Sequence, residues 1–100
     1  MPAVARCDTD TIYTGHACDG TAGIQPALQS KVYVNGYKCA IVGDAIKPHT
    51  ILVEMVCVGH GAEINAGSGK VFIGGIPIAR VGDSADAGSV KTGSGTVNAG

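Results

Sequence analysis

The chain has 100 residues, 45% of them hydrophobic, and a formal net charge of −1 at pH 7. This length predicts a single domain over residues 1–100 with a small core, and the near-neutral charge argues against nucleic acid as a partner. Aromatic residues make up only 4% and tryptophan is absent, which argues against a large aromatic-lined cofactor pocket.

Glycine is frequent, with sixteen residues spread between short β-branched clusters. Because glycine weakens a helix by about 1 kcal/mol per position, this spacing predicts an all-β fold of short strands and tight turns. The longest apolar run, TILVEMVCVG (residues 50–59), is about half the length that spans a bilayer, and Glu54 interrupts it.

The N-terminal segment MPAVARCDTD has no charged region followed by an apolar stretch, so we expect no signal peptide. We therefore expect the chain to be made and folded in the cytoplasm. In that compartment its four cysteines are more often metal ligands or buried thiols than disulfides.

An internal repeat organises the chain. SKVYVNGYKCAIVGD (residues 30–44) and GKVFIGGIPIARVGD (residues 69–83) match almost position for position. In each copy an alternating strand leads into Asn-Gly or Gly-Gly, which favour two-residue hairpin turns because both turn residues need positive φ. The repeat therefore predicts two short hairpins that each end at Gly-Asp.

Fragments of the same unit lie at both ends of the chain. PAVARCD (residues 2–8) is the closing half of the unit, and GSGTVNAG (residues 93–100) resembles its opening half. Three like units predict a pseudo-threefold body, with hairpins at one level and three connecting loops gathered at the other. The predicted loops are residues 9–29, 45–67 and 84–92.

Charged residues recur at equivalent positions of the units. Asp8, Asp44 and Asp83 follow the strand ends, where a carboxylate caps a turn by accepting backbone N–H bonds. Arg6 and Arg80 also match in position. The recurrence predicts turn capping for the aspartates and a packing or docking role for the arginines, rather than catalysis.

All three histidines lie in the predicted loops, and we predict that His16, His49 and His60 share a metal ion. One thiolate would complete a tetrahedral site with three imidazoles. Cys57, in a Cys-x-x-His pair with His60, is the favoured fourth ligand, and Cys18, two residues after His16, is the alternative. Such a closed site has no open position for water, so we expect it to be structural.

Other motifs give little support for catalysis. Cys7 and Cys39 lie in the predicted closing strands and are expected to be buried, inert thiols. AGSGKV lacks the first glycine and the hydroxyl residue of a phosphate-binding loop, and no Gly-x-Ser-x-Gly string is present.

The motifs PAVAR, IPIARVGD and the preceding V-x-V/I strands with Asn-Gly or Gly-Gly resemble the PAAR-repeat family, named for a Pro-Ala-Ala-Arg motif. The resemblance covers nearly the whole chain, although the middle copy lacks both the proline and the arginine. It implies a small conical domain of short strands and hairpins with pseudo-threefold arrangement. It also implies a metal ion near the apex, zinc (Zn) rather than iron (Fe), held by three histidines and one cysteine. Relatives often carry a cysteine in the third loop, where this sequence has Asp86 or Ala87.

The resemblance also implies a structural, non-enzymatic function. Short members form a membrane-piercing tip that caps and sharpens a trimeric β-helical spike, either the central spike of a contractile phage tail or a VgrG-like spike of type VI secretion. One monomer on each trimer and transient contact with a target cell membrane follow from that role.

Because the sequence stops at Gly100, we expect no appended effector domain. This favours the tip of a phage baseplate spike in the virion, made in the host cytoplasm, over secretion through a type VI apparatus. The alternative function is a small zinc metalloenzyme or metal-binding module, with Glu54 or Glu63 as acid or base.

Overall fold

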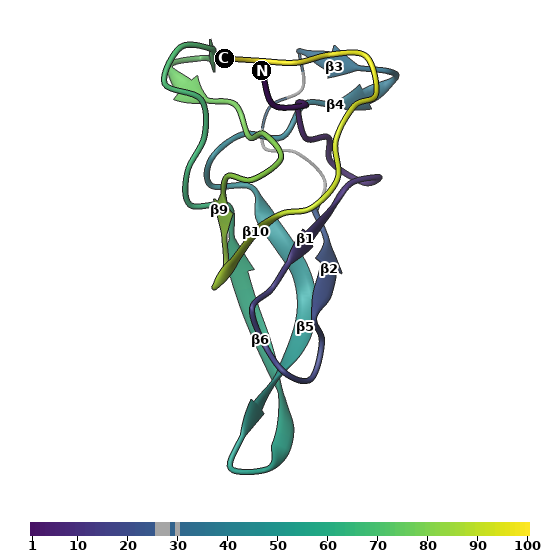
Figure 1. Cartoon of the computed structure of the whole chain (residues 1–100), viewed down its shortest axis with the longest axis vertical. Coiled ribbons are helices and arrows are strands. Elements are labelled where there is room, and N and C mark those ends of the chain that lie inside the picture. The colour runs from purple at the N-terminus through teal and green to yellow at the C-terminus, as the bar shows by residue number, and fades with distance from the viewer. Residues whose placement is uncertain (26–28, 30) are drawn as a thin grey trace.

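The computed structural model describes residues 1–25, 29 and 31–100, and this part of the chain forms ten strands and no helix. The all-β prediction is confirmed, and nothing in these residues is a helix that could cross a membrane. Ser30 of the predicted repeat and residues 26–28 of the first predicted loop lie outside the described residues. The molecule measures 40 × 24 × 22 Å and narrows from an end that carries both termini to a single projecting hairpin (Figure 1).

The two repeats form short hairpins at the wide end of the molecule. Their turns are Asn35-Gly36 and Gly74-Gly75, and all four residues have positive φ, as the two dipeptides predict. The paired strands are β3 (Tyr33–Val34) with β4 (Tyr37–Lys38), and β7 (Phe72–Ile73) with β8 (Ile76–Pro77).

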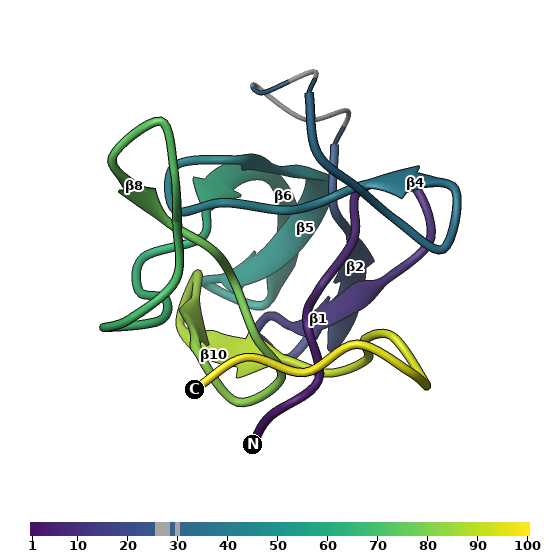
Figure 2. The ribbon, with the colours of Figure 1, turned by 90° about the horizontal axis from the view of Figure 1, so that it is seen from above.

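The two chain ends pair with each other beside these hairpins. Ala3 and Asn98 form an antiparallel bridge, and the backbone N–H of Val4 donates to the carbonyl of Val97 at 3.0 Å. The two terminal fragments of the repeat therefore lie together as a third part of the wide end. Figure 2 shows the three parts arranged around the long axis.

Three alanines mark this axis. The backbone N–H of Ala5 donates to Ala79, that of Ala79 to Ala40, and that of Ala40 to Ala5, at 2.9, 2.9 and 3.0 Å. Each alanine has 0% of its surface exposed. This closed ring of hydrogen bonds is the pseudo-threefold axis that the repeat predicts, and it explains why each unit keeps a small residue at this position.

The three segments predicted as loops are instead β-hairpins. Each hairpin pairs strands that are neighbours in the chain, but none of the three turns carries the Asn-Gly or Gly-Gly signal by which the short hairpins are predicted. The strands are β1 (Thr11–Tyr13), β2 (Thr21–Gly23), β5 (Ala45–Val53), β6 (Val56–Glu63), β9 (Ser84–Ala85) and β10 (Gly88–Val90).

These hairpins close into a ring. β1 pairs with β10 in a sheet of order β2-β1-β10-β9. Ile24, which follows β2, bridges Ile46 of β5, and Ile64, which follows β6, bridges Ala85 of β9. Each hairpin therefore contacts the other two, and the prediction that the three segments gather at one level is confirmed.

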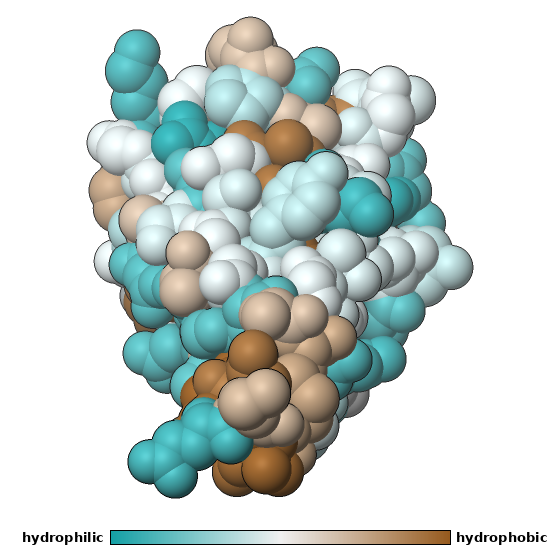
Figure 3. Space-filling view, turned by 60° about the horizontal axis from the view of Figure 1, so that its bottom comes forward, coloured by the Kyte–Doolittle hydropathy of each residue, from teal (hydrophilic) through white to brown (hydrophobic). Residues whose placement is uncertain are grey.

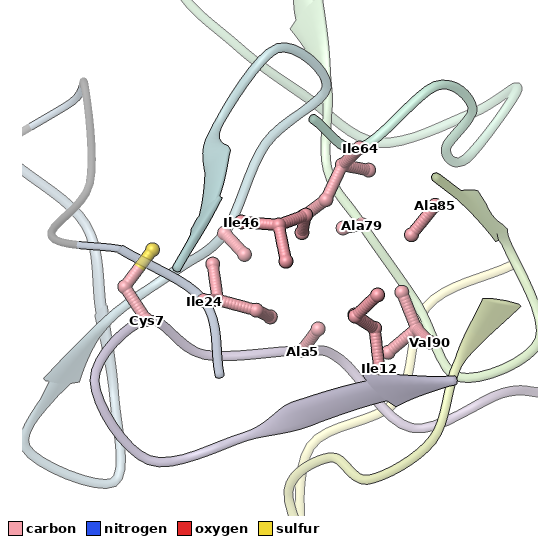
Figure 4. Packing of buried hydrophobic residues seen from close by; sticks show 10 residues of the cluster. Ala5, Cys7, Ile12, Ile24, Ile46, Ile64, Ala79, Ala85 and Val90 are labelled. Atoms are coloured by element: carbon pink, nitrogen blue, oxygen red, sulfur yellow. The ribbon is translucent and has the colours of Figure 1, made fainter. Parts of the chain in front are cut away.

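The main core fills the ring. Each of the hairpins β1–β2, β5–β6 and β9–β10, which we call the long hairpins, contributes two inward side chains to it. Figure 4 shows these side chains pointing toward one another between the strands. They are Ile12 and Ile24, Ile46 and Ile64, and Ala85 and Val90. Small aliphatic side chains are enough to fill this core, because the strands of the ring leave little volume around its axis.

Aspartates cap the turns as predicted, except that Asp10 takes the place of Asp8. Asp44 and Asp83 each accept a backbone N–H from three residues earlier, at 2.7 and 2.8 Å, as predicted. The assignment of Asp8 to this role is wrong, because Asp8 is exposed and has φ of +65°. Asp10 takes the role instead and accepts the backbone N–H of Arg6 at 2.8 Å, since the first turn is longer.

The two recurrent arginines bind these capping carboxylates. Arg6 Nε lies 2.8 Å from Asp10 Oδ2, and Arg80 Nη2 lies 2.9 Å from Asp83 Oδ1. In each pair, the arginine and the aspartate belong to the same turn. The predicted packing role of the arginines is confirmed, because each one ties the end of a closing strand to its own turn.

Candidate metal centre

The three histidines converge in the narrow half of the molecule. His49 of β5 and His60 of β6 are direct cross-strand partners, and His16 reaches them from the segment between β1 and β2. Their ring centroids lie 5.0–5.9 Å apart. The expectation that no histidine lies on a strand is wrong for His49 and His60, but the gathering itself is present.

Asp86 lies at the centre of the three imidazoles. Its carboxylate oxygens are 3.0 Å from His16 Nε2, 2.7 Å from His49 Nε2 and 3.2 Å from His60 Nε2. Burial alone would raise the pKa of Asp86, but the three imidazole partners outweigh it and hold this pKa below its ordinary value. The carboxylate is therefore ionised and faces three ring nitrogens.

The proton on His49 can be assigned from its other contact. His49 Nδ1 lies 2.9 Å from the carbonyl oxygen of Lys47, which can only accept, so Nδ1 carries the proton and donates. In the neutral ring, Nε2 then presents a lone pair to an Asp86 oxygen 2.7 Å away. Two acceptors this close need a cation or a further proton between them.

The donor set fits a metal ion. One ligand atom from each of His16, His49, His60 and Asp86 lies within 4.8 Å of all the others. Zinc bonds of about 2.0 Å in a tetrahedron place the ligand atoms about 3.3 Å apart, close to the observed 2.7–3.2 Å between the imidazoles and the carboxylate. This cluster could therefore hold a metal ion.

The family comparison agrees with the repeat and with the conical β fold. Residues 56–100, a little under half of the chain, match the family model of the PAAR motif. This part of the chain carries a PAAR motif. No curated protein matches the chain.

The PAAR family is structural rather than enzymatic, and its members lie on a trimeric spike. The motif implies association with phage-tail or secretion machinery and fits a spike-tip role in contractile injection systems. His60 and Asp86 lie inside the residues that match the PAAR motif, whereas His16 and His49 precede them.

Cys57, the predicted fourth ligand, is not part of the cluster. It forms a disulfide with Cys18, the alternative ligand, so both sulfurs are engaged and the expectation of unpaired cysteines is wrong for this pair. Cys57 lies three residues before His60 on β6 and pairs with Leu52. Because side chains alternate along a strand, this odd spacing directs Cys57 and His60 to opposite faces. The Cys-x-x-His pattern chelates from a loop but not from a strand.

The fourth donor, Asp86, is one of the two third-loop positions, with Ala87, at which the resemblance implies a cysteine in relatives. It lies in the two-residue turn between β9 and β10 with φ of +52°, a conformation that aspartate tolerates better than most residues. The short Asp-Ala turn after Ser84–Ala85 was the available signal in the sequence. The prediction favours the thiolates of Cys57 and Cys18 over this carboxylate.

A glycine allows His16 to reach Asp86. Gly15 has φ of +78°, and a Cβ at this position would lie 2.6 Å from the carbonyl oxygen of Ala87. The N–H of Ala87 in turn donates to the carbonyl of Thr14 at 3.1 Å. The β1–β2 segment therefore lies directly against the β9–β10 turn, and this contact brings His16 and Asp86 together.

Proposed function

We propose that this protein is the tip of the central spike of a contractile injection machine. In this role the chain, folded as one domain over residues 1–100, caps and sharpens the end of a trimeric β-helical spike. The ring of Ala5, Ala40 and Ala79 carries the proposal, because it lets one chain present a nearly threefold surface to a threefold partner.

The wide end has the chemistry of a docking surface. We call it the base, formed by the hairpins β3–β4 and β7–β8 and by the paired chain ends. An apolar hollow of about 290 Å³ opens there, lined by residues such as Val34, Phe72 and Ile78. Exposed apolar or aromatic side chains surround it: Val32, Tyr33, Tyr37, Val71, Ile76 and Val97. Exposed apolar patches of this kind mark interaction sites, and a blunt β-helix needs its open strand edges covered.

We further propose that His16, His49, His60 and Asp86 hold a zinc ion. One or more ligands come from each long hairpin: His16 from β1–β2, His49 and His60 from β5–β6, and Asp86 from β9–β10. Bound zinc would supply a structural cross-link between all three hairpins, because four protein ligands leave no open position for water. Its binding free energy would become folding free energy.

The metalloenzyme alternative receives no specific support. Glu54 lies in the turn of the β5–β6 hairpin, five residues beyond His49, which along a strand is about 16 Å. Glu63 is exposed, and its backbone carbonyl, rather than its side chain, accepts a hydrogen bond from Asp86. We therefore favour a mechanical function over an acid–base one.

Elemental analysis of the purified protein tests the metal site. We expect about one zinc per chain, lost in His60→Ala and in Asp86→Ala. Cys57→Ser should keep the metal if the disulfide arrangement is correct, and it serves as the matched control. Loss of zinc in Cys57→Ser with retention in Asp86→Ala would contradict the assignment of the fourth ligand.

Binding to a trimeric β-helical spike tests the role itself. Native mass spectrometry should find one chain per spike trimer. Phe72→Asp in the base should abolish the complex, whereas Met55→Asp at the opposite end should leave it intact. Absence of a complex with wild-type protein would contradict the spike-tip function. Detection of the chain in purified phage tails or in type VI secreted fractions then distinguishes the two machines, of which we favour the phage virion.

A further inference from the structure

The Cys18–Cys57 disulfide lies beside two residues of the metal cluster. Cys18 follows His16 by two residues, and Cys57 precedes His60 by three. The disulfide joins the segment between β1 and β2, which carries His16, to the strand that carries His60. It therefore connects two pieces of backbone that must come together to assemble the histidines, although neither sulfur is a member of the cluster.

The position of His16 depends on this connection more than the positions of the other two histidines do. His49 and His60 face each other as cross-strand partners of one hairpin. His16 lies outside the strands, and its backbone N–H donates to Thr14 Oγ1 at 3.1 Å, a contact within its own segment. The distance from His16 to the other two imidazoles is therefore set by how firmly the β1–β2 segment is attached to the β5–β6 hairpin.

Beside the cluster, this segment is attached to the hairpin by hydrogen bonds as well as by the disulfide. The Asp19 carboxylate accepts both the backbone N–H and the hydroxyl of Thr50 at 2.7 Å. The Asp19 N–H donates to the Thr50 carbonyl at 3.3 Å. Because Asp19 keeps part of the attachment, breaking the disulfide should loosen the segment without releasing it.

The disulfide is accessible to a reductant. Cys57 is exposed and Cys18 is half-buried, whereas the free cysteines Cys7 and Cys39 are both buried. Figure 3, in which the narrow end is turned forward, shows the outer part of the projecting hairpin as an uncovered surface on which hydrophobic side chains gather. Met55, in its turn, is 93% exposed. Exposed disulfides are more easily reduced than buried structural ones, and regulatory disulfides are found among them.

We propose that the Cys18–Cys57 disulfide positions His16 for metal binding, so that zinc binds more tightly to the oxidised protein than to the reduced one. This inference rests on the zinc site of the proposed function. The cross-link removes metal-free conformations in which His16 lies away from its partners, and a preorganised site binds more tightly because less order has to be created. By thermodynamic linkage, the disulfide is harder to reduce in the zinc-bound protein, by the same factor.

The redox step is a thiol–disulfide exchange with a small thiol such as glutathione. A glutathione thiolate attacks the sulfur of Cys57, the exposed partner, the S–S bond breaks, and Cys18 leaves as a thiolate that takes up a proton. A second glutathione thiolate attacks the glutathione sulfur of the mixed disulfide, and Cys57 leaves and is protonated. The protein gains two electrons and two protons, and two glutathione molecules become one glutathione disulfide. A reducing compartment would therefore weaken the zinc site, and an oxidising one would strengthen it.

The zinc affinity of the two redox states is the first measurement. Competition with a chromophoric chelator should give a dissociation constant about tenfold larger for protein reduced with a phosphine than for oxidised protein. The paired variant Cys18→Ser with Cys57→Ser is the matched control. It should have the affinity of the reduced protein, and the phosphine should not change it. Because structural zinc sites are tight, a tenfold change still leaves purified Cys57→Ser loaded with metal.

Two results of this competition would overturn the proposal. One is equal affinity in the oxidised and reduced states. The other is tighter binding by the reduced protein, which would indicate that a released thiolate becomes a ligand.

The reduction potential of the disulfide is the second measurement, made on wild-type protein in glutathione buffers with thiols trapped by alkylation. Zinc should lower this potential by about 30 mV, the shift that a tenfold coupling requires for a two-electron couple. His60→Ala should show no zinc-dependent shift. No shift in wild type, or a shift to higher potential, contradicts the inference. Circular dichroism must show that the reduced protein is folded, since its unfolding would mean that the disulfide acts on global stability and not on the position of His16.

These results are distinguishable from failure of the proposed function. Equal zinc binding in both redox states would keep the zinc site and remove the positioning role of the disulfide. No zinc in either state would remove both, whereas a complex with the spike would leave the spike-tip function standing. Redox-dependent zinc affinity without a spike complex would remove the spike-tip function alone.

Discussion

Ala5, Ala40 and Ala79 face one another across the axis with no exposed surface, and their backbones are joined in a ring. An alanine at this position is therefore a packing requirement in this chain. A larger side chain on the axis must displace at least one of the other two strands, because a closed ring cannot expand at one point only.

Ala79→Leu should therefore lower the free energy of unfolding by about 1–3 kcal/mol. Thermal unfolding monitored by circular dichroism measures the change. Ala45→Leu, at an exposed position of β5, is the control and should have little effect. A stable Ala79→Leu variant would mean that the axis has more room than the structure shows.

Cys7 and Cys39 are buried as predicted, and they should make stability sensitive to alkaline pH. Burial, reinforced by the Asp44 carboxylate, raises the pKa of Cys39 from 9.0 to about 11 and raises that of Cys7 as well. Below pH about 9 both states keep the proton and the stabilisation is complete. Above it the unfolded chain loses the proton first, so stability falls as pH rises toward 11.

We expect the free energy of unfolding to fall by up to about 1.4 kcal/mol per pH unit in this window for each thiol. Urea unfolding at pH 8, 9 and 10 measures the slope. Cys39→Ala should have a shallower slope than wild type, whatever its absolute stability. Identical slopes would show that other groups cause the alkaline loss.

Among the elements, the β5–β6 hairpin depends on its link to the β1–β2 segment. The Cys18–Cys57 disulfide spans a sequence separation of 39 residues, which corresponds to a stabilisation of about 2–4 kcal/mol. The paired variant Cys18→Ser with Cys57→Ser should therefore unfold at a lower temperature.

Thiol titration provides the independent check. Denatured wild-type protein should have two reactive thiols, Cys7 and Cys39, and native protein none, because both are buried. Four reactive thiols in the denatured protein would show that the disulfide is absent and would return Cys57 to consideration as a metal ligand.

The sequence predicts the short hairpins but not the long ones, for a physical reason. Asn35-Gly36 and Gly74-Gly75 specify their turns locally, whereas the turn at Glu54 and Met55 carries no glycine or asparagine signal. Its strands form because the 9 residues of β5 and the 8 residues of β6 pair over a long register, aided by packing on the other two hairpins. The loop positions of the three histidines are enough to predict that they lie together. Asp86 cannot be chosen as the fourth ligand from the sequence alone, because the sequence does not show which face of its strand Cys57 occupies.

At the scale of the whole molecule, the cluster of His16, His49, His60 and Asp86 links all three long hairpins, while the alanine ring joins the closing strands nearer the base. The two ends of the core are thus held by different interactions. Loss of either the metal cluster or the alanine ring should therefore loosen one end of the core more than the other.

Metal removal by a chelator should therefore lower the melting temperature and loosen the narrow half first. Hydrogen exchange measures this by region. Amides of β1, β5 and β6 should lose protection, whereas Ala5, Ala40 and Ala79 should keep theirs. Uniform loss of protection would show that the ion is required for folding of the whole chain, and no loss would show that the cluster is stable without it.

The alanine ring has one more consequence, for how the assembled machine must be imaged. A body with three nearly equal sides can be seated on a threefold partner in three rotational settings 120° apart. The sides differ in detail, since Asn35-Gly36, Gly74-Gly75 and the joined chain ends replace one another around the axis. A map averaged with threefold symmetry would superimpose the three and blur the single projecting hairpin, so the orientation of this hairpin can be seen only when each particle is aligned without symmetry.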